Sequence, residues 1–471
     1  MIINLPKYYL KYAIVTYFFV LLSVMIMNIQ GVMPVIWICI SSITFISFFY
    51  FLKNLPVSWH KYSDSYFRKK LFKTALAIRV VVVIFMYFLF EVLNSRPFEF
   101  DAGDSLFYHN LATQMSDKAL NLDSRFYSDI TSFIAFSDRG YPVFLTFLYC
   151  LFFKSIFLTR IVHAVFGAWS CVVIYDLTKR NFNEPTARLA GIIMLLLPNL
   201  IYYCGLHLKE TIMTFLTILS INYADIIFKE QKLKLTNILV LALCIFSLFT
   251  LRTLLAVAVL FSFFFSVVIT KKMGTKTRKI IVFVIILAFG GIIFASFLKD
   301  DINFYRNGVK GNQQAQLQHF ATRQNGNKLA VYGSKAIFAP LILTAPFPTL
   351  TDTHQDNQMM SSGAVFTHNI YSFFIIMSFF LIIKRGLWRK YSLILAFVTS
   401  YIVILIFSAF VLSERFHLPS LPFLAILAAY GMYELNNHER KYIKYYAIFL
   451  FFISCVIIGW NWFKLAGRDM I

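Results

Sequence analysis

Two aspartates, Asp101 and Asp104, lie three residues apart in the polar segment FEFDAGDSLFYHNLATQM. A carboxylate in such a segment can act as a general base that removes a proton from a hydroxyl or amine acceptor. Asp104 could instead cap a helix beginning at Ser105, because its side chain can accept hydrogen bonds from backbone N–H groups at the positive end of the helix dipole. The sequence leaves both interpretations of Asp104 open.

A second polar group, His207, Lys209 and Glu210, occurs in the short segment LHLKE. Glu210 could bind an acceptor, a metal or a lysine. The alternative is an ordinary hydrated turn with Glu210 in the first turn of a helix, where negative charge is favoured.

Two arginines, Arg252 in TLRTLL and Arg415 in SERFHLPSLP, interrupt or border apolar runs, and His417 accompanies the second. The guanidinium group presents a fork of donors that fits phosphate oxygens and stays charged, so a phosphate or pyrophosphate ligand is its natural partner. An arginine that reaches toward lipid headgroups is the alternative. Arg139, just before GYP, could face the same site.

The elements that must position these residues are membrane-spanning helices. The chain has 471 residues, of which 59% are hydrophobic, and its mean hydropathy is +0.70, which excludes a soluble domain. The net charge of +22 would suggest nucleic acid binding in a soluble protein, but here Lys and Arg cluster in loops between apolar runs. These loops, which end near residues 73, 188, 234, 279, 390 and 444, are expected to be cytoplasmic. The six cysteines show no pattern of a disulfide or metal site.

Since a spanning helix needs about 20 apolar residues, the sequence predicts an all-α polytopic membrane protein with about thirteen transmembrane helices. Their expected ranges are 12–29, 32–52, 74–93, 157–177, 187–205, 211–228, 235–250, 253–270, 278–298, 367–384, 390–411, 418–435 and 443–461. Arg79 is expected near the cytoplasmic end of the third span and Arg160 near the outer end of the fourth, both as anchors.

Two long outer segments are the candidate working parts. Residues 94–156 should contain a surface helix with Phe107, Leu111 and Met115 on one face. A juxtamembrane or re-entrant helix, begun by Gly140 and Pro142, should follow at 141–153. The second segment, 299–366, resembles a lid in its mixture of polar and proline-containing apolar runs, and an ordered loop is the alternative.

The predicted division has four parts: two transmembrane helices and a basic cytoplasmic loop at 1–73, a transmembrane core at 74–298 with the outer loop 94–156, the outer loop 299–366, and the C-terminal transmembrane helices at 367–471.

The chain resembles the GT-C superfamily of integral membrane glycosyltransferases, which includes protein mannosyltransferases and the lipid A aminoarabinose transferase. The resemblance lies in the order of five segments: FDAGDSLFYHNLA, RGYPVFLTFLYCLFF, LHLKE, TLRTLL and RFHLPSLPFLAILAAYG. The resemblance implies inverting transfer of a sugar from a polyprenyl-phosphate donor to an envelope glycan, lipid or protein on the extracytoplasmic face. It also implies that Asp104, four residues before Tyr108, is the catalytic base, with Asp101 as the second candidate. Arg252 and Arg415 would bind the carrier phosphate with help from His417. The full set of candidate substrate-binding residues is Tyr108, Arg139, His207, Lys209, Glu210, Arg252, Arg415 and His417.

The sequence requires no cofactor and leaves a divalent metal open, and it gives no sign of a nucleic acid partner. Membrane lipid should surround the protein, and the expected location is the cytoplasmic membrane of a bacterium. One alternative function is an O-antigen polymerase or ligase, with its working groups around Arg323 and Lys328. A lipid or solute transporter is a weaker alternative, because the sequence shows no inverted repeat and few charges at mid-membrane depth.

Overall fold

The computed structural model describes residues 7–27, 31–123, 125, 136–230, 234–269, 341–352, 355–407, 413–436 and 439–465. Within these ranges the chain is helical, and its only β-type pairing is an isolated bridge between Val32 and Thr351. The predicted all-α polytopic fold is therefore confirmed.

The N-terminal half begins with three long helices, α1 (Lys7–Met27), α2 (Val35–Trp59) and α3 (Asp64–Asn94). Beyond them lie α4 (Gly103–Leu120), the short η1 (Phe136–Asp138), α6 (Gly140–Phe152), α7 (Ile156–Asn181), α8 (Glu184–Leu196), α9 (Pro198–Cys204), α10 (Glu210–Glu230), α11 (Leu235–Leu251) and α12 (Thr253–Ile269). Ser63, Ser155 and Asn183 cap α3, α7 and α8 by accepting backbone N–H bonds, so the starts of these helices are encoded locally.

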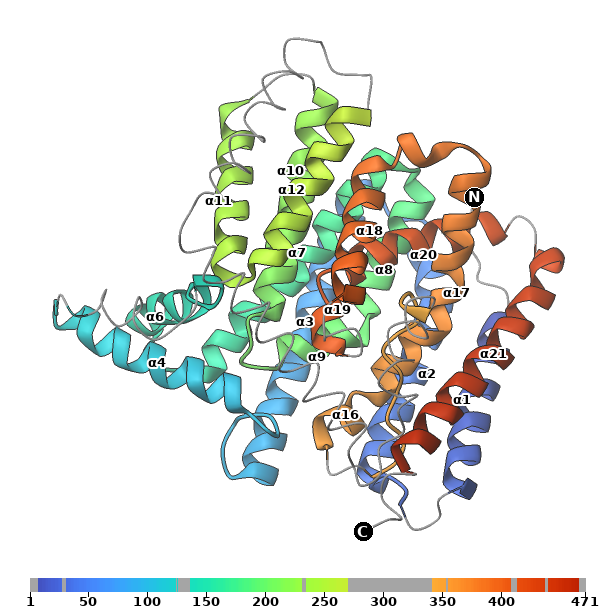
Figure 1. Ribbon diagram of the computed structural model, residues 1–471, viewed down its shortest axis with the longest axis horizontal. Helices are drawn as coiled ribbons and strands as arrows, with labels where there is room; N and C mark the ends of the chain where they lie inside the picture. The colour runs from blue at the N-terminus through green and yellow to red at the C-terminus, as the bar shows by residue number, and fades with distance from the viewer. Residues whose placement is uncertain are drawn as a thin grey trace.

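The C-terminal half contains α16 (Asp356–Met360), α17 (Ser362–Lys384), η2 (Leu387–Arg389), α18 (Ser392–Phe407), α19 (Glu414–His417), α20 (Leu421–Asn436) and α21 (Glu439–Leu465). Figure 1 shows α10, α11, α12 and α18 on one side of the bundle and α1, α2, α17 and α21 on the other. Between them α20 packs against α8 and α17, and α7 packs against α3, α8 and α10.

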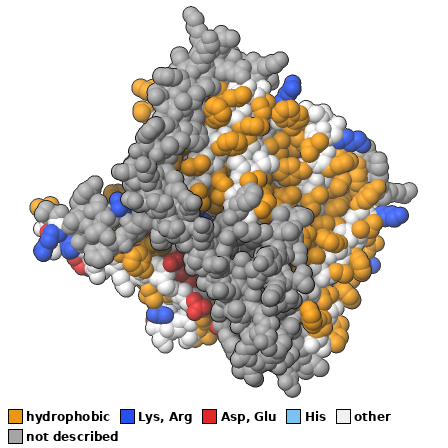
Figure 2. All heavy atoms as spheres, viewed as in Figure 1, with side chains coloured by type: hydrophobic (Ala, Val, Ile, Leu, Met, Phe, Trp, Pro, Cys, Tyr) orange, Lys and Arg blue, Asp and Glu red, His pale blue; other side chains and the backbone are white. Residues whose placement is uncertain are grey.

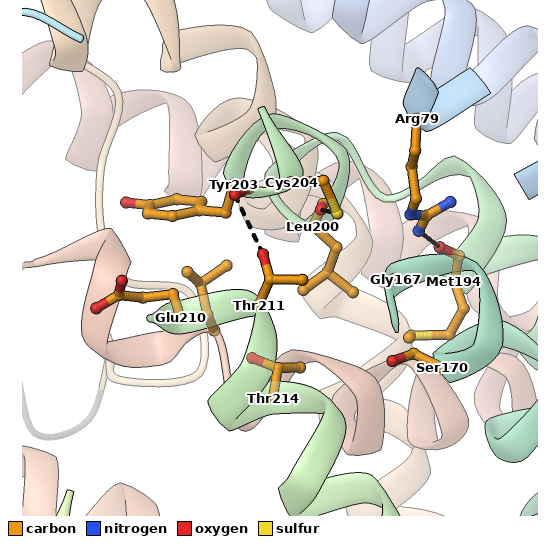
Figure 3. A pocket seen from close by; sticks show the side chains of 11 residues that line it. Arg79, Gly167, Ser170, Met194, Leu200, Tyr203, Cys204, Glu210, Thr211 and Thr214 are labelled. Atoms are coloured by element: carbon orange, nitrogen blue, oxygen red, sulfur yellow. Dashed lines mark hydrogen bonds between the residues drawn. The ribbon is translucent and has the colours of Figure 1, made fainter. Parts of the chain in front are cut away.

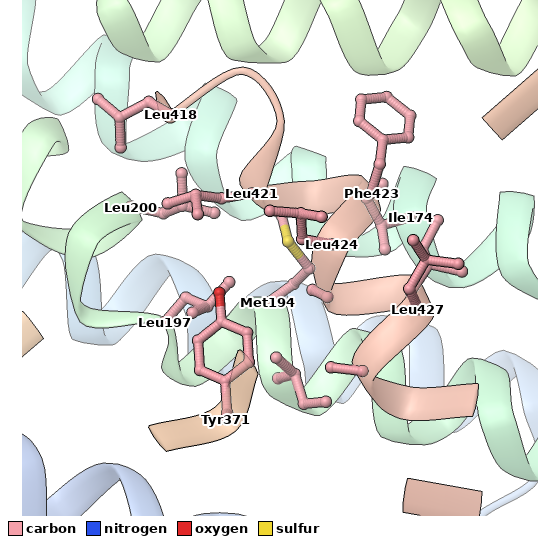
Figure 4. Packing of buried hydrophobic residues seen from close by; sticks show 14 of the residues in the cluster. Ile174, Met194, Leu197, Leu200, Tyr371, Leu418, Leu421, Phe423, Leu424 and Leu427 are labelled. Atoms are coloured by element: carbon pink, nitrogen blue, oxygen red, sulfur yellow. The ribbon is translucent and has the colours of Figure 1, made fainter. Parts of the chain in front are cut away.

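The centre of the bundle is a cluster of buried apolar side chains. Helix α20 contributes Leu421, Leu424 and Leu427 to this cluster (Figure 4). They lie among Ile174 of α7, Met194 of α8 and Leu197, which follows α8. These side chains are almost fully buried. This cluster packs α8 against α20.

Seven helices among the described residues are long and apolar enough to cross a membrane, or eight if the bent pair α8–α9 forms one span. Large apolar side chains such as Phe19, Phe85 and Phe451 are exposed on the outside of the bundle, and Figure 2 shows a broad hydrophobic surface of this kind. Both features support an integral multi-pass membrane protein.

Helices are present at every predicted span except 278–298, which lies outside the described residues. The four that match 235–250, 253–270, 390–411 and 418–435 have only 16 or 17 residues. A total of thirteen crossings therefore stays a prediction.

Helices α4 and α6 form a helical ledge: they pack side by side and project sideways from the bundle (Figure 1). A short helix is present where one was expected at 141–153: α6 has 13 residues. Its juxtamembrane or re-entrant placement stays a prediction. The predicted apolar face of the preceding helix is partly wrong. Leu111 and Met115 are buried, but Phe107 is 48% exposed and Tyr108 takes the buried position beside it.

Most of the predicted lid, residues 299–340, lies outside the described part of the chain. Its apolar end is packed into the protein, because Ile342, Phe347 and Leu350 are buried. Asn461 of α21 accepts a hydrogen bond from the backbone N–H of Leu350 at 2.8 Å and so fastens this stretch to the last helix.

The close approach of α2 and α17 depends on Gly363, where an added Cβ would lie 2.7 Å from the Cα of Ser41. We expect Gly363→Ala to separate these helices and to destabilise the protein by about 1–3 kcal/mol, the usual cost of overpacking a core. Thermal unfolding of the purified protein in detergent measures this. Gly459→Ala is the matched control, since a Cβ there has no neighbour within 4 Å. Equal melting temperatures for the two variants would contradict the packing argument.

Candidate active site

Four charged residues from separate parts of the sequence meet beside the ledge; we call Asp104, Glu210, Arg252 and Arg415 the acid–arginine cluster. Arg415 donates to Glu210 through Nε and to Asp104 through Nη1. Arg252 Nη2 lies 3.7 Å from the same Glu210 Oε1 atom. Glu210 is fully buried, whereas the Asp104 side chain is 57% exposed, so the cluster runs from the protein interior to the surface.

Arg252 reaches this cluster because it forms the break between α11 and α12. Its backbone is extended, with φ of −166°, and its N–H still donates to Leu248 O at 2.7 Å. The guanidinium carbon lies 4.1 Å from the centre of the Phe416 ring, an attractive cation–π contact. Because Arg252 is only 7% exposed, the headgroup-anchor interpretation is wrong for this residue. The predicted turn between two short helices is present.

Asp104 lies in the first turn of α4, but it does not cap the helix. The residue that precedes the helix is Ala102, which makes no side-chain cap, and the Asp104 carboxylate bonds to Arg415 instead. The capping interpretation is therefore wrong. Asp101 is exposed in the turn before α4, with φ of +51°, and is not bonded to the cluster among the described residues.

Lys209 is buried and held by protein groups. It donates to the Asp138 carboxylate of η1 and to Leu251 O at 2.9 Å, and its Nζ lies 6.0 Å from the Tyr108 ring centre. Burial lowers the pKa of Lys209, and the Asp138 carboxylate offsets part of that effect. These contacts tie the turn before α10 to the end of α11. Asp138 was missed from the sequence, although it directly precedes the candidate Arg139.

His207 is buried in a chain of ring contacts rather than in the acid–arginine cluster. Tyr149 OH lies 3.2 Å from His207 Nε2 and 2.7 Å from His109 Nδ1, so the tyrosine links the turn to the ledge. Burial lowers the pKa of His207 well below its usual value, which favours the neutral ring. Tyr108 is also buried, with its hydroxyl 3.5 Å from Asp138, and burial raises its pKa.

Two further candidate residues, Arg139 and His417, precede α6 and α20. Arg139 precedes α6, and its guanidinium carbon lies 5.9 Å from the Phe136 ring centre. His417 is buried at the end of α19, two residues beyond Arg415. The roles of Arg139 and His417 as substrate ligands stay predictions.

Glu414 is a site residue that the sequence interpretation missed. It begins α19 beside Arg415 and accepts a 2.6 Å hydrogen bond from Asn199 Nδ2 of α9. Burial raises the pKa of Glu414 to about 7, and the hydrogen bonds from Asn199 and Ser361 offset part of the rise. An acidic residue adjacent to a candidate phosphate-binding arginine was the available signal.

The cluster has unused binding capacity. Arg252 Nη1 and Glu210 Oε2 are buried and have no hydrogen-bond partner among the residues that the structure describes. Burial lowers the pKa of Arg415, but the Glu210 and Asp104 carboxylates more than offset this, so its pKa lies well above the usual value. The site therefore offers permanent positive charge next to a surface carboxylate. No group of three or more His, Cys, Asp or Glu suited to a metal occurs in the described ranges.

Comparison with known families matches residues 140–298 to the dolichyl-phosphate-mannose-protein mannosyltransferase family. The matched region begins at α6 and includes Lys209, Glu210 and Arg252, while Asp104 and Arg415 lie outside it. No curated protein matches the chain.

The raised pKa of Glu414 predicts a pH-dependent stability. Its folded pKa of about 7 exceeds the ordinary value of 4.5, so the folded state holds the proton more tightly than the unfolded state. This residue's contribution to stability should therefore fall as pH rises from 4.5 to about 7 and then stay level.

The measurement is the melting temperature of the wild type and of Glu414→Gln across this range. Gln can still accept the bond from Asn199 but does not ionise. The wild type should lose stability relative to the variant as pH rises toward 7. Parallel curves for the two proteins would show that Glu414 titrates normally.

Proposed function

We propose a reaction for this protein on the basis of the family match. That match supports a membrane glycosyltransferase of the GT-C superfamily that uses a polyprenyl-phosphate-linked sugar. The protein transfers the sugar with inversion to an envelope glycan, lipid or protein on the extracytoplasmic face. Asp104 is the general base, and Arg252 and Arg415 bind the carrier phosphate.

The single observation that carries this proposal is the meeting of two guanidinium groups and a surface carboxylate around the buried Glu210. Arginine suits a phosphate because its paired N–H groups match the oxygens in geometry and charge. Arg252 still has a buried donor without a partner. Glu210 holds both arginines in one place and partly neutralises them before the donor binds.

In the proposed reaction these groups act on the acceptor and on the leaving phosphate. The acceptor oxygen or nitrogen bonds to the anomeric carbon while the bond from that carbon to the phosphate oxygen breaks. The proton of the acceptor moves to Asp104, and the leaving phosphate keeps the electron pair. Since a phosphate is already a good leaving group, stabilising its negative charge matters more than protonating it, and positively charged donors fixed in advance provide that stabilisation.

The contact between Asp104 and Arg415 suggests how binding prepares the base. A phosphate that takes the Nη1 group of Arg415 competes with the Asp104 carboxylate for the same donor. Donor binding would then free Asp104 to accept a hydrogen bond from the acceptor. The exposed position of Asp104 allows the acceptor to approach from outside the protein.

The outward orientation of this site rests on the distribution of charge in the loops. The basic loops expected to be cytoplasmic lie at the other ends of the helices that carry the cluster. Arg180 of α7 and Lys229 of α10, for example, flank Asp225 at the ends of these helices opposite to Arg160 and Glu210. This orientation favours an acceptor in the cell envelope.

Asp104→Asn tests the assignment of the base. We expect transfer of labelled sugar from the lipid-linked donor, measured in membranes, to fall by about two to four orders of magnitude, because Asn cannot accept a proton. Asp117→Asn is the matched control: Asp117 lies on the same helix and pairs with Lys154 at 2.6 Å, but away from the cluster.

Full transfer by Asp104→Asn would reject Asp104 as the base, and the same assay on Asp101→Asn would show whether Asp101 takes that role. Loss of transfer on alanine substitution of Arg323 and Lys328, with Asp104→Asn active, would favour the polymerase or ligase alternative. Both of those basic residues lie outside the described part of the chain.

A further inference from the structure

A buried arginine outside the cluster, Arg79, lies at the midpoint of the 31-residue helix α3. It is 0% exposed and forms no ion pair with any acidic residue in the described ranges. A charge inside a membrane-spanning helix is costly, so it is retained where it has a specific task.

The hydrogen bonds of Arg79 show what that task is. Its Nη2 donates to Met194 O of α8 at 3.1 Å, and its Nη1 donates to Ala75 O at 3.3 Å. In a continuous helix Met194 O would accept from the backbone N–H of residue 198. That residue is Pro198, which has no N–H. Arg79 therefore supplies the donor that the proline removes.

The same contact lies at the end of a half-helix. α8 ends at Leu196, α9 begins at Pro198, and their axes differ by 48°. A helix of 13 residues is about 20 Å long, so α8 ends deep within the membrane-spanning bundle. The carbonyl end of a helix carries partial negative charge, which a guanidinium group stabilises.

A third helix makes room for this arrangement. At Gly167 of α7 an added Cβ would lie 2.7 Å from both Arg79 Nε and Cys204 Sγ. Figure 3 shows Arg79 and Met194 joined at one end of a small pocket and Glu210 at the other, with Tyr203, Cys204 and Thr211 between them. The pocket thus connects the capped helix end to the acid–arginine cluster.

The bend sets the position of Glu210. α9 is only seven residues long and leads directly into the turn before Glu210. Thr211 Oγ1 donates to Tyr203 O at 3.1 Å and closes this turn. A straight continuation of α8 would carry the turn along a different axis and away from Arg252 and Arg415.

We propose that Arg79 is a positioning residue for the active site: it caps the carbonyl end of α8 that Pro198 leaves open and so holds the bend that places Glu210. Its relevance to transfer rests on the proposed function, but the capping itself does not. The competing idea is that Arg79 binds an anionic group of the substrate directly from the pocket.

The experiment compares Arg79→Leu, Pro198→Ala and the double variant by thermal unfolding in detergent, with the transferase assay alongside. We expect Arg79→Leu to lower the melting temperature by about 5 °C or more, because it leaves Met194 O buried without a donor. In the Pro198→Ala background the backbone N–H can serve that carbonyl, so the loss caused by Arg79→Leu should shrink to less than half. Pro56→Ala, a proline inside α2, is the control background and should leave the loss unchanged.

Equal losses in the Pro198→Ala and wild-type backgrounds would overturn the proposal. So would an unchanged melting temperature for Arg79→Leu combined with abolished transfer, which is the result expected of a direct ligand. If Arg79→Leu does not fold, Arg79→Lys gives the same comparison with a smaller loss. The melting-temperature comparison of Arg79→Leu in the two backgrounds does not require catalysis, so it tests the capping by Arg79 even if the proposed function is wrong. Full transfer by Asp104→Asn, in contrast, would reject the catalytic assignment and leave the capping untouched.

Discussion

The structure around the site depends on one buried carboxylate, Glu210, which receives guanidinium groups from two distant parts of the chain. A lone charge at 0% exposure would be strongly unfavourable, and so would two arginines packed together without an acid. Each of the three charges therefore requires the others. Asp104 completes the set at the surface. This difference in burial separates the three inner charges from an outer carboxylate that can respond to a ligand.

This cluster is held by breaks in helices rather than by their regular parts. Arg252 stands in a one-residue break between α11 and α12, and Glu210 follows the bend between α8 and α9. Within a membrane each break exposes backbone groups that need new partners. Arg79 provides one such partner, at Met194 O. The breaks leave backbone groups without their helical partners, which is unfavourable, and the same breaks place Arg252 and Glu210 in the cluster.

The sequence predicted the helical membrane fold because apolar runs of spanning length are a direct physical requirement of the bilayer. It also predicted the break at Arg252, since a single arginine in an apolar run has to reach a polar partner or water. Asp138 and Glu414 were missed because they act through contacts with Lys209 and Asn199, each far away in the sequence. Spacing alone could not show that Asp104 turns toward Arg415 instead of capping α4, or that Tyr108 replaces Phe107 on the buried face.

The most direct measurement of the central claim is the binding of a polyprenyl phosphate without sugar to the purified protein, compared with Arg252→Gln and Arg415→Gln. Binding reports the phosphate contact without requiring the acceptor or turnover. Loss of a charged hydrogen bond to the ligand should weaken the affinity of each variant by about tenfold or more. Unchanged affinity in both variants would contradict the assignment of the acid–arginine cluster as the phosphate site.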